Sequence, residues 1–285
     1  MSNKIPNIDD LTSGISNLVN TNDMNVQTQW YLFMIVTVIY FVIRWIRSGK
    51  EYSPSETQDE IKKWDNLWLL FYVCFSIVVQ VLTNFQLTQN RCGSTYYNLA
   101  INSVVFPWLF IFGPLIAILD IIPGWKAPFS NTIGYLITKM NGIETILKGI
   151  LKTPNGQDKT ATAQAIKQVY SDPSILINEI TPENFDTFWQ QSEKDGLFKS
   201  NLKDINKSKN FLRSRIVRKD LISEFIWYVL TGTFVLSLTY SYIISEKCNL
   251  TPDQLKQQEN NYNKVTDAIQ KLKVEANSDL SSIKK

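Results

Sequence analysis

The residues of this sequence best able to do chemistry are its cysteines, because the chain contains no histidine. The absence of histidine excludes His-based catalytic triads, His-ligated metals and the commonest general base. Cys92 and Cys248 each follow a long apolar segment, whereas Cys74 lies inside one and is expected to be a small buried hydrophobic residue. The spacing fits neither a CxxC motif nor a zinc site. A disulfide between Cys92 and Cys248 is therefore the candidate, with two unrelated free thiols as the alternative.

Motifs for other catalytic or transport chemistry are weak. The sequence has no glycine-rich phosphate loop. Pumps and carriers place ionisable groups or broken helices within the membrane, and the residue that comes closest is Asp120, at the end of an apolar segment. Gln80, Asn102, Pro107 and Pro114 could line a path, but such residues more often kink a helix or bond to a neighbouring one. We therefore expect no enzyme, no metal and no cofactor.

Four apolar segments, at 30–46, 67–87, 100–122 and 225–244, form the framework of the chain. A spanning helix needs roughly 20 apolar residues, which the last three segments provide; the short first one depends on interfacial aromatic residues. Buried helices of a soluble protein are the alternative, but those usually carry charge on one face. The sequence predicts an all-α, multi-pass membrane protein with about four transmembrane helices, three of them within 30–122. The other expected parts are a polar N-terminal arm (1–29), a corner with an amphipathic interfacial helix (123–152), a small helical cytosolic domain (153–224) and a C-terminal helical tail (245–285).

The distribution of basic residues predicts which side of the membrane each connection occupies. The 44–65 connection carries five Lys or Arg and the 123–224 segment carries fifteen, so the positive-inside rule places both in the cytosol. Both termini and the short 88–99 loop then face the other side. This topology puts Cys92 and Cys248 in one oxidising compartment, which favours the disulfide.

The stretch that follows the third apolar segment predicts a stiff corner. Pro123 and Gly124 should end the spanning helix, since proline cannot continue it and glycine tolerates the turn. Trp125 and Lys126 are expected at the level of the lipid headgroups, because aromatic and basic side chains favour that position on the cytosolic side.

The second half of the corner predicts the start of a new helix. Pro128 should keep Ala127 extended, and Ser130 or Asn131 should cap a helix over 131–152. Apolar residues then recur with helical spacing on one face of this helix. A helix lying in the membrane surface is one interpretation, and a helix packed on the 153–224 domain is the other. The apolar positions are Ile133, Leu136, Ile137, Met140, Ile143, Leu147, Ile150 and Leu151.

Three further groups are candidates for partner contacts. The helical domain presents an aromatic face, and its thin core favours contact with a partner or the membrane. Basic residues crowd the entry to the fourth apolar segment. The tail has the spacing of a short coiled-coil seam, with a helix folded onto its own protein as the alternative. The candidates are Phe185, Phe188 and Trp189 in the domain, Arg213, Arg215 and Arg218 before the segment, and Leu255, Tyr262, Val265, Ile269 and Leu272 in the tail.

The stretch FPWLFIFGPLIAILDIIPGWKAPFSNTIGY, at 106–135, resembles membrane proteins encoded by nucleocytoplasmic large DNA viruses. In these a hydrophobic span is followed by a similar corner, and the resemblance covers about a tenth of the chain. It implies a minor capsid protein embedded in the membrane beneath an icosahedral shell, without catalytic residues. The matching corner positions are Pro123, Gly124, Trp125, Pro128, Phe129, Ser130, Asn131, Gly134 and Tyr135.

The function expected from these features is structural. The protein would anchor the inner membrane of a large DNA virus, derived from the host endoplasmic reticulum, to its capsid shell. An accessory subunit of a large membrane complex, for example in a protist mitochondrion, and a channel or transporter are the alternatives. The expected partners are the lipid bilayer and other capsid or membrane-complex proteins, with self-association left open and no specific nucleic acid.

Overall fold

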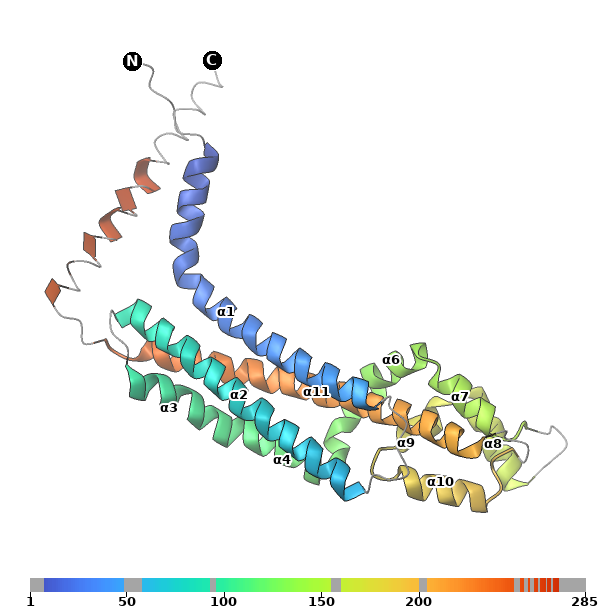
Figure 1. Ribbon diagram of the computed structural model, residues 1–285. Helices are drawn as coiled ribbons and strands as arrows, with labels where there is room; N and C mark the ends of the chain where they lie inside the picture. The colour runs from blue at the N-terminus through green and yellow to red at the C-terminus, as the bar shows by residue number, and fades with distance from the viewer. Residues whose placement is uncertain are drawn as a thin grey trace, which may run out of the picture. The chain divides into compact units, whose positions relative to one another are not determined.

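The computed structural model of the protein describes residues 8–48, 58–92, 96–154, 160–199 and 204–248, with scattered residues between 252 and 271. The described residues are mostly helical (Figure 1). They also contain an isolated antiparallel β-bridge between Leu151 and Phe198. Four of the helical segments are long and apolar enough to cross a membrane. The predicted fold class, an all-α multi-pass membrane protein, is confirmed.

The spanning helices extend beyond the apolar segments that predicted them. They are α1 (Ile8–Ser48), α2 (Gln58–Cys92), the pair α3 (Tyr97–Pro107) and α4 (Gly113–Ile121), and α11 (Ile205–Ser245). Helix α1 takes up most of the predicted polar arm. Helix α11 includes the last twenty residues of the predicted domain, because no proline or glycine interrupts the chain between 205 and 231.

The third span is irregular at its two prolines. A single π-helical turn, η1 (Trp108–Phe112), joins α3 to α4, and it lies between Pro107 and Pro114. Proline lacks the backbone N–H and its ring crowds the carbonyl one turn earlier, so the regular hydrogen-bond ladder cannot continue through it. The prolines therefore reshape the helix, as the kink interpretation of the sequence requires.

The chain divides into two compact units, which we describe separately. The first comprises Met1–Tyr31, Val78–Val105 and Leu236–Lys285, and the second comprises Leu32–Ile77 and Phe106–Val235. Three of the long helices contribute segments to both units.

A chain of buried polar side chains joins four helices in the first unit. Gln29 of α1 donates to Asn84 of α2 at 2.6 Å, and Asn84 donates to Ser103 of α3 at 3.0 Å. The hydroxyl of Thr239, on α11, donates to the backbone oxygen of Ser103 at 2.8 Å. Hydrogen bonds between helices stabilise packing in lipid, where the alternative is an unsatisfied polar group. None of these four side chains is ionisable, and their hydrogen bonds link the four helices.

Aromatic rings fill the second unit between its spanning helices. Tyr40, Tyr72 and Tyr228 stack on one another, and Phe112 contacts the last two. The Tyr72 hydroxyl lies 3.0 Å from that of Thr37, so the phenol is not left unpaired. Such rings bury a large area, and their shapes hold neighbouring helices in one arrangement. Cys74 lies outside this core: it is exposed, contrary to the buried position that the sequence predicted.

The helical domain belongs to the second unit and has its own hydrophobic core. It comprises α7 (Ile143–Ile150), α8 (Ala161–Ser171), α9 (Ser174–Glu179), α10 (Phe185–Lys194) and the first three turns of α11. A β-bridge between Leu151 and Phe198 closes it. The fully or almost fully buried residues are Ile143, Leu147, Ile150, Leu151, Ile177, Ile180, Phe185, Trp189, Phe198, Leu212 and Ile216.

Local capping explains where the short helices of the domain begin. Thr160 accepts a hydrogen bond from the Ala163 N–H at the start of α8, and Asp172 accepts one from the Ser174 N–H at the start of α9. Before α10, the side chains of Thr181 and Asn184 each accept from the other's backbone N–H. These contacts satisfy N–H groups that lack a partner within the helix.

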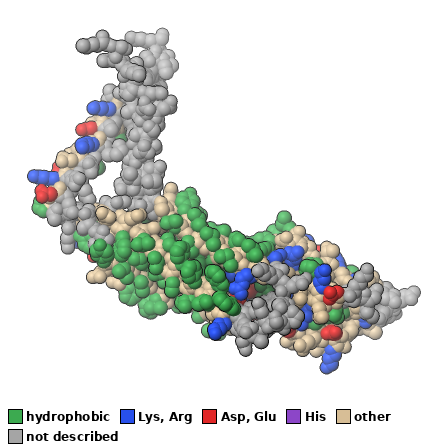
Figure 2. Space-filling model, viewed as in Figure 1, with side chains coloured by type: hydrophobic (Ala, Val, Ile, Leu, Met, Phe, Trp, Pro, Cys, Tyr) green, Lys and Arg blue, Asp and Glu red, His purple; other side chains and the backbone are tan. Residues whose placement is uncertain are grey.

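Apolar and charged side chains lie on different parts of the molecular surface. Figure 2 shows apolar side chains over the spanning helices and a concentration of Lys, Arg, Asp and Glu over the helical domain. Exposed apolar residues on the spanning helices include Phe71, Leu82 and Phe110, each more than half exposed. Such a surface is stable against hydrocarbon but not against water.

Candidate functional site

The corner after α4 is built from four short helical pieces. They are η2 (Pro123–Lys126), α5 (Ala127–Phe129), η3 (Ser130–Gly134) and α6 (Tyr135–Met140). The chain turns at Ile122, whose φ of −122° and ψ of 77° lie outside the helical region. The prediction that Pro123 and Gly124 follow the end of the span matches this geometry.

Two local predictions about the corner are wrong. Ala127 is helical, with φ −54° and ψ −41°, rather than extended. Ser130 and Asn131 do not cap a helix, because both lie within the π-helical turn η3. The preference of residues before proline for extended structure is weak enough for tertiary contacts to overcome, and this segment makes many of them.

Lys126, which the sequence predicted at the headgroup level, is the centre of a buried ion network. Its side chain is only 6% exposed. Its Nζ lies 2.6 Å from Asp220 Oδ2, 3.2 Å from Glu183 Oε1 and 3.6 Å from Glu224 Oε1. Arg44, on α1, forms a salt bridge with the same Glu224. The network thus connects the corner, α1, α11 and the loop before α10.

Mutual attraction favours the charged forms of Lys126 and Glu183 although burial opposes them. Burial alone would lower the pKa of Lys126, but the carboxylates of Asp220 and Glu224 outweigh burial and raise the pKa. Burial would likewise raise the pKa of Glu183, and attraction to Lys126 holds it below its ordinary value instead. A buried charge is costly unless it is paired and hydrogen-bonded, and each of these groups has an ionic partner.

Hydrogen bonds to the corner backbone complete its attachment to α11. Ser223 Oγ donates to the Lys126 carbonyl at 2.6 Å, and Trp227 Nε1 donates to the Trp125 carbonyl at 2.9 Å. The Trp227 ring also packs edge-on against Phe129. These contacts occupy backbone acceptors that the irregular helical turns leave available.

A second buried lysine, Lys219 on α11, reaches across the corner to the helical domain. Lys219 is 1% exposed, and its Nζ donates to the Ile177 carbonyl at 2.7 Å and to Asn131 Oδ1 at 3.2 Å. The backbone of Gly134 lies directly against the Lys219 carbonyl, so a Cβ atom there would overlap the oxygen. Gly134 is needed because two backbones approach closely. Gly124 has no such requirement, because a Cβ there would meet nothing within 4 Å.

The apolar stripe after the corner divides into two faces with different surroundings. In α6, Leu136 and Met140 are 57% and 82% exposed. A left-handed glycine, Gly142 with φ 82°, ends this piece. In α7, Ile143 and Leu147 are fully buried in the domain core. The predicted continuous helix over 131–152 is therefore wrong: the α7 half of the stripe packs on the domain, and Leu136 and Met140 in the α6 half are exposed.

The ion network around Lys126 links the corner, α1, α11 and the loop before α10 through charge pairs. Its acids and bases pair with one another, and the described residues contain no group of three or more Cys, Asp or Glu side chains that could hold a metal. No sequence pattern singled out Asp220, Glu224 or Glu183 as site residues. The spacing of Asp220 and Glu224, four apart on a helix entering an apolar segment, could have indicated a buried pair.

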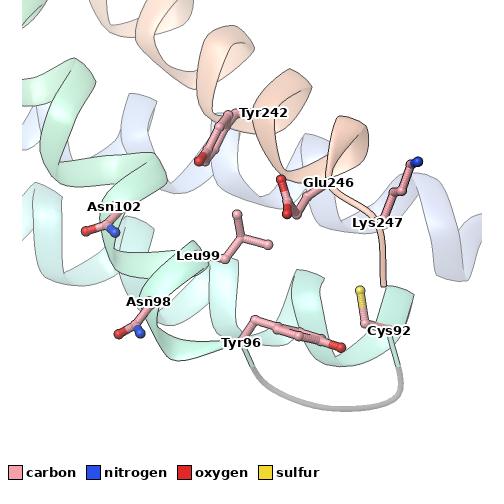
Figure 3. A pocket seen from close by; sticks show the side chains of 8 residues that line it. All are labelled: Cys92, Tyr96, Asn98, Leu99, Asn102, Tyr242, Glu246 and Lys247. Carbon is pink, nitrogen blue, oxygen red and sulfur yellow. The ribbon is translucent and has the colours of Figure 1, made fainter. Parts of the chain in front are cut away.

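The two cysteines singled out in the sequence are joined by a disulfide in the first unit. Cys92 ends α2 and Cys248 follows α11, and their Cα atoms are 5.2 Å apart. Beside α2's end, Arg91 donates to the backbone oxygen of Ile243. A cavity of about 320 Å³ adjoins the disulfide, and Figure 3 shows the side chains around it. It is lined by Cys92, Tyr96, Asn98, Leu99, Asn102, Tyr242, Glu246 and Lys247.

The aromatic face predicted for partner contact packs inside the domain instead. Phe185 is fully buried and Trp189 is 4% exposed, while Phe188 is partly buried against the same core. Arg213 forms a salt bridge with Asp186 at 2.9 Å. A thin domain uses its largest rings to build its own core, because they bury the most area, and they are unavailable to a partner.

The other predicted contact residues are at least partly exposed, or their side chains are not among those that the structure describes. Arg215 and Arg218 are half-buried on α11, and the tail residues Tyr262 and Ile269 are exposed. Leu255, Val265 and Leu272 lie outside the residues whose side chains the structure describes. No family model, curated protein or solved structure matches the chain.

Proposed function

We propose that the protein is a structural, non-catalytic membrane protein that ties a membrane to a protein shell, in the manner of a minor capsid protein of a large DNA virus. The observation that carries the proposal is the attachment of the corner to α11. Lys126 and Asp220 lie 94 positions apart in the sequence, yet the two are bonded at 2.6 Å and buried. Such a network makes the link between a span and the helical domain stiff.

Stiffness is what an anchor needs and a flexible tether lacks. A domain on a loose linker can bind a shell without fixing its distance from the membrane. Here the link consists of short helical turns with buried ionic contacts, so force on the domain passes to the spanning helices. The exposed Leu136 and Met140 add an apolar face that fits the membrane surface beside the corner.

The proposal includes a sidedness. The 44–65 and 123–224 segments face the cytosol or the capsid, since they carry most of the basic residues. Both termini and the disulfide lie on the opposite, oxidising side. The partners on the domain side are capsid proteins, and the protein resides in the inner membrane of the virion.

The test is quantitative mass spectrometry of the material that co-purifies with the full chain from native membranes or particles. We expect a major shell protein at comparable abundance. Recovery with respiratory or translocase subunits instead would show an accessory role in a membrane complex and refute the proposal.

A matched pair of variants links this test to the structure. Lys126→Met removes the centre of the network, and Lys167→Met removes an exposed lysine of α8. We expect both to enter membranes, but only Lys126→Met to lose the shell protein. Equal recovery of shell protein with both variants would show that the corner does not set the attachment.

A further inference from the structure

Two arginines of α11 carry charge that no described residue neutralises. Arg215 and Arg218 lie three residues apart, so their side chains are neighbours on one helix face. In the part of the chain that the structure describes, no carboxylate lies within ion-pair distance of either. Nearby basic residues differ, because Arg213 pairs with Asp186 and Arg44 with Glu224.

Arg215 and Arg218 are both half-buried, so it is costly that neither has a counter-ion among the described residues. The Nε atom of Arg215 is removed from solvent and has no hydrogen-bond partner. Arg218 stacks on the Trp45 ring, with its central carbon 4.9 Å from the ring centre, and its Nε donates to Ser48 Oγ at 3.3 Å. Its terminal nitrogens remain available to an anion. Two positive charges held close together in a poorly solvated position favour the binding of an anion.

The position of the pair identifies the kind of anion. Trp45 and Ser48 lie at the end of α1, where the first apolar segment stops. Arg218 precedes Phe225, where the fourth apolar segment starts, by seven residues, or about 10 Å of helix. Tryptophan favours the headgroup level, so the stacked arginine lies where lipid phosphates lie.

We propose that Arg215 and Arg218, with Trp45 and Ser48, bind the phosphate of an anionic lipid headgroup. Arginine suits this ligand because its planar fork forms two parallel hydrogen bonds to phosphate oxygens. Trp45 holds the Arg218 fork in place through its ring, and Ser48 holds its Nε. The site goes beyond the structural role proposed above and does not depend on it.

The experiment uses the full chain in nanodiscs of phosphatidylcholine mixed with phosphatidylglycerol, with native mass spectrometry counting the lipids retained. We expect the wild type to retain phosphatidylglycerol preferentially. Each basic residue at such a surface contributes about 1 kcal/mol, so Arg215→Gln with Arg218→Gln should weaken retention about thirtyfold. Arg215→Gln alone removes no hydrogen bond or ion pair among the described residues, and it should weaken retention about fivefold even if the double variant fails to fold.

The control is Lys167→Gln with Lys194→Gln, which removes the same charge from exposed positions of the domain. It should retain the lipid as the wild type does. Loss in the control equal to that in the arginine variants would show general charge attraction and overturn the site. If soluble inorganic phosphate displaced the retained phosphatidylglycerol as effectively as added phosphatidylglycerol does, the assignment to a lipid would be overturned. Retention by Arg215→Gln equal to that of the wild type would also refute the site.

Discussion

Replacing Lys126 by methionine tests the ion network most directly. Methionine keeps much of the side-chain volume but removes the ammonium group, which leaves Asp220 without its partner at 2.6 Å. The Asp220 side chain is 10% exposed and that of Glu224 is 16% exposed, so water cannot replace the lost charge. Removing one partner of a buried pair costs about 3–5 kcal/mol. Glu183, at 47% exposure, adds little to that sum because solvent screens it.

The assay is thermal unfolding of the purified full chain in detergent, followed by tryptophan fluorescence. Trp125 and Trp227 lie in contact at the corner, so their emission reports on it. Lys139→Met is the matched control, since its salt bridge to Glu144 involves a lysine side chain that is 53% exposed. The control should lose less than about 1 kcal/mol of unfolding free energy.

The pH dependence gives a second measure of the same interaction. The pKa of Lys126 is raised on folding, so its contribution to stability is fully present below the ordinary pKa of lysine. That contribution is lost as the pH rises through the raised pKa. Wild type should therefore lose this contribution only in strong alkali, and Lys126→Met should lack that alkaline loss. If Lys126→Met costs no more than Lys139→Met, the network does not hold the corner and our reasoning is wrong.

Three further predictions follow from other contacts. Gly134→Ala should cost roughly 1–3 kcal/mol in the same melting assay, because its Cβ would overlap the Lys219 carbonyl; an unchanged melting temperature would contradict the close approach. Cys92→Ser should cost about 2–4 kcal/mol and abolish a mobility shift on reduction, whereas a shift that persists would exclude the disulfide. Met140→Asp, at an exposed position, should melt within about 1 kcal/mol of wild type in detergent, while Ile143→Asp, fully buried, should lose about 3 kcal/mol or more. Equal melting of these last two variants would refute the division of the apolar stripe.

The sequence by itself determined the spanning helices, because the signal for them is local. A run of roughly 20 apolar residues is long enough to span a bilayer, and its backbone forms a helix there regardless of which segments pack beside it. The same local chemistry predicted the turn at Pro123. It also gave the candidate pair Cys92 and Cys248, because counting spans fixes which connections share a side.

Only the tertiary structure decided what the corner does. Lys126 looked like a headgroup-level lysine because its partners Asp220 and Glu224 come almost one hundred residues later, and no local pattern pairs them. The stripe after the corner has one periodicity, yet Met140 is exposed and Ile143 is buried. Periodicity reports which residues share a helix face, but whether that face meets lipid or protein depends on which distant segments pack against it.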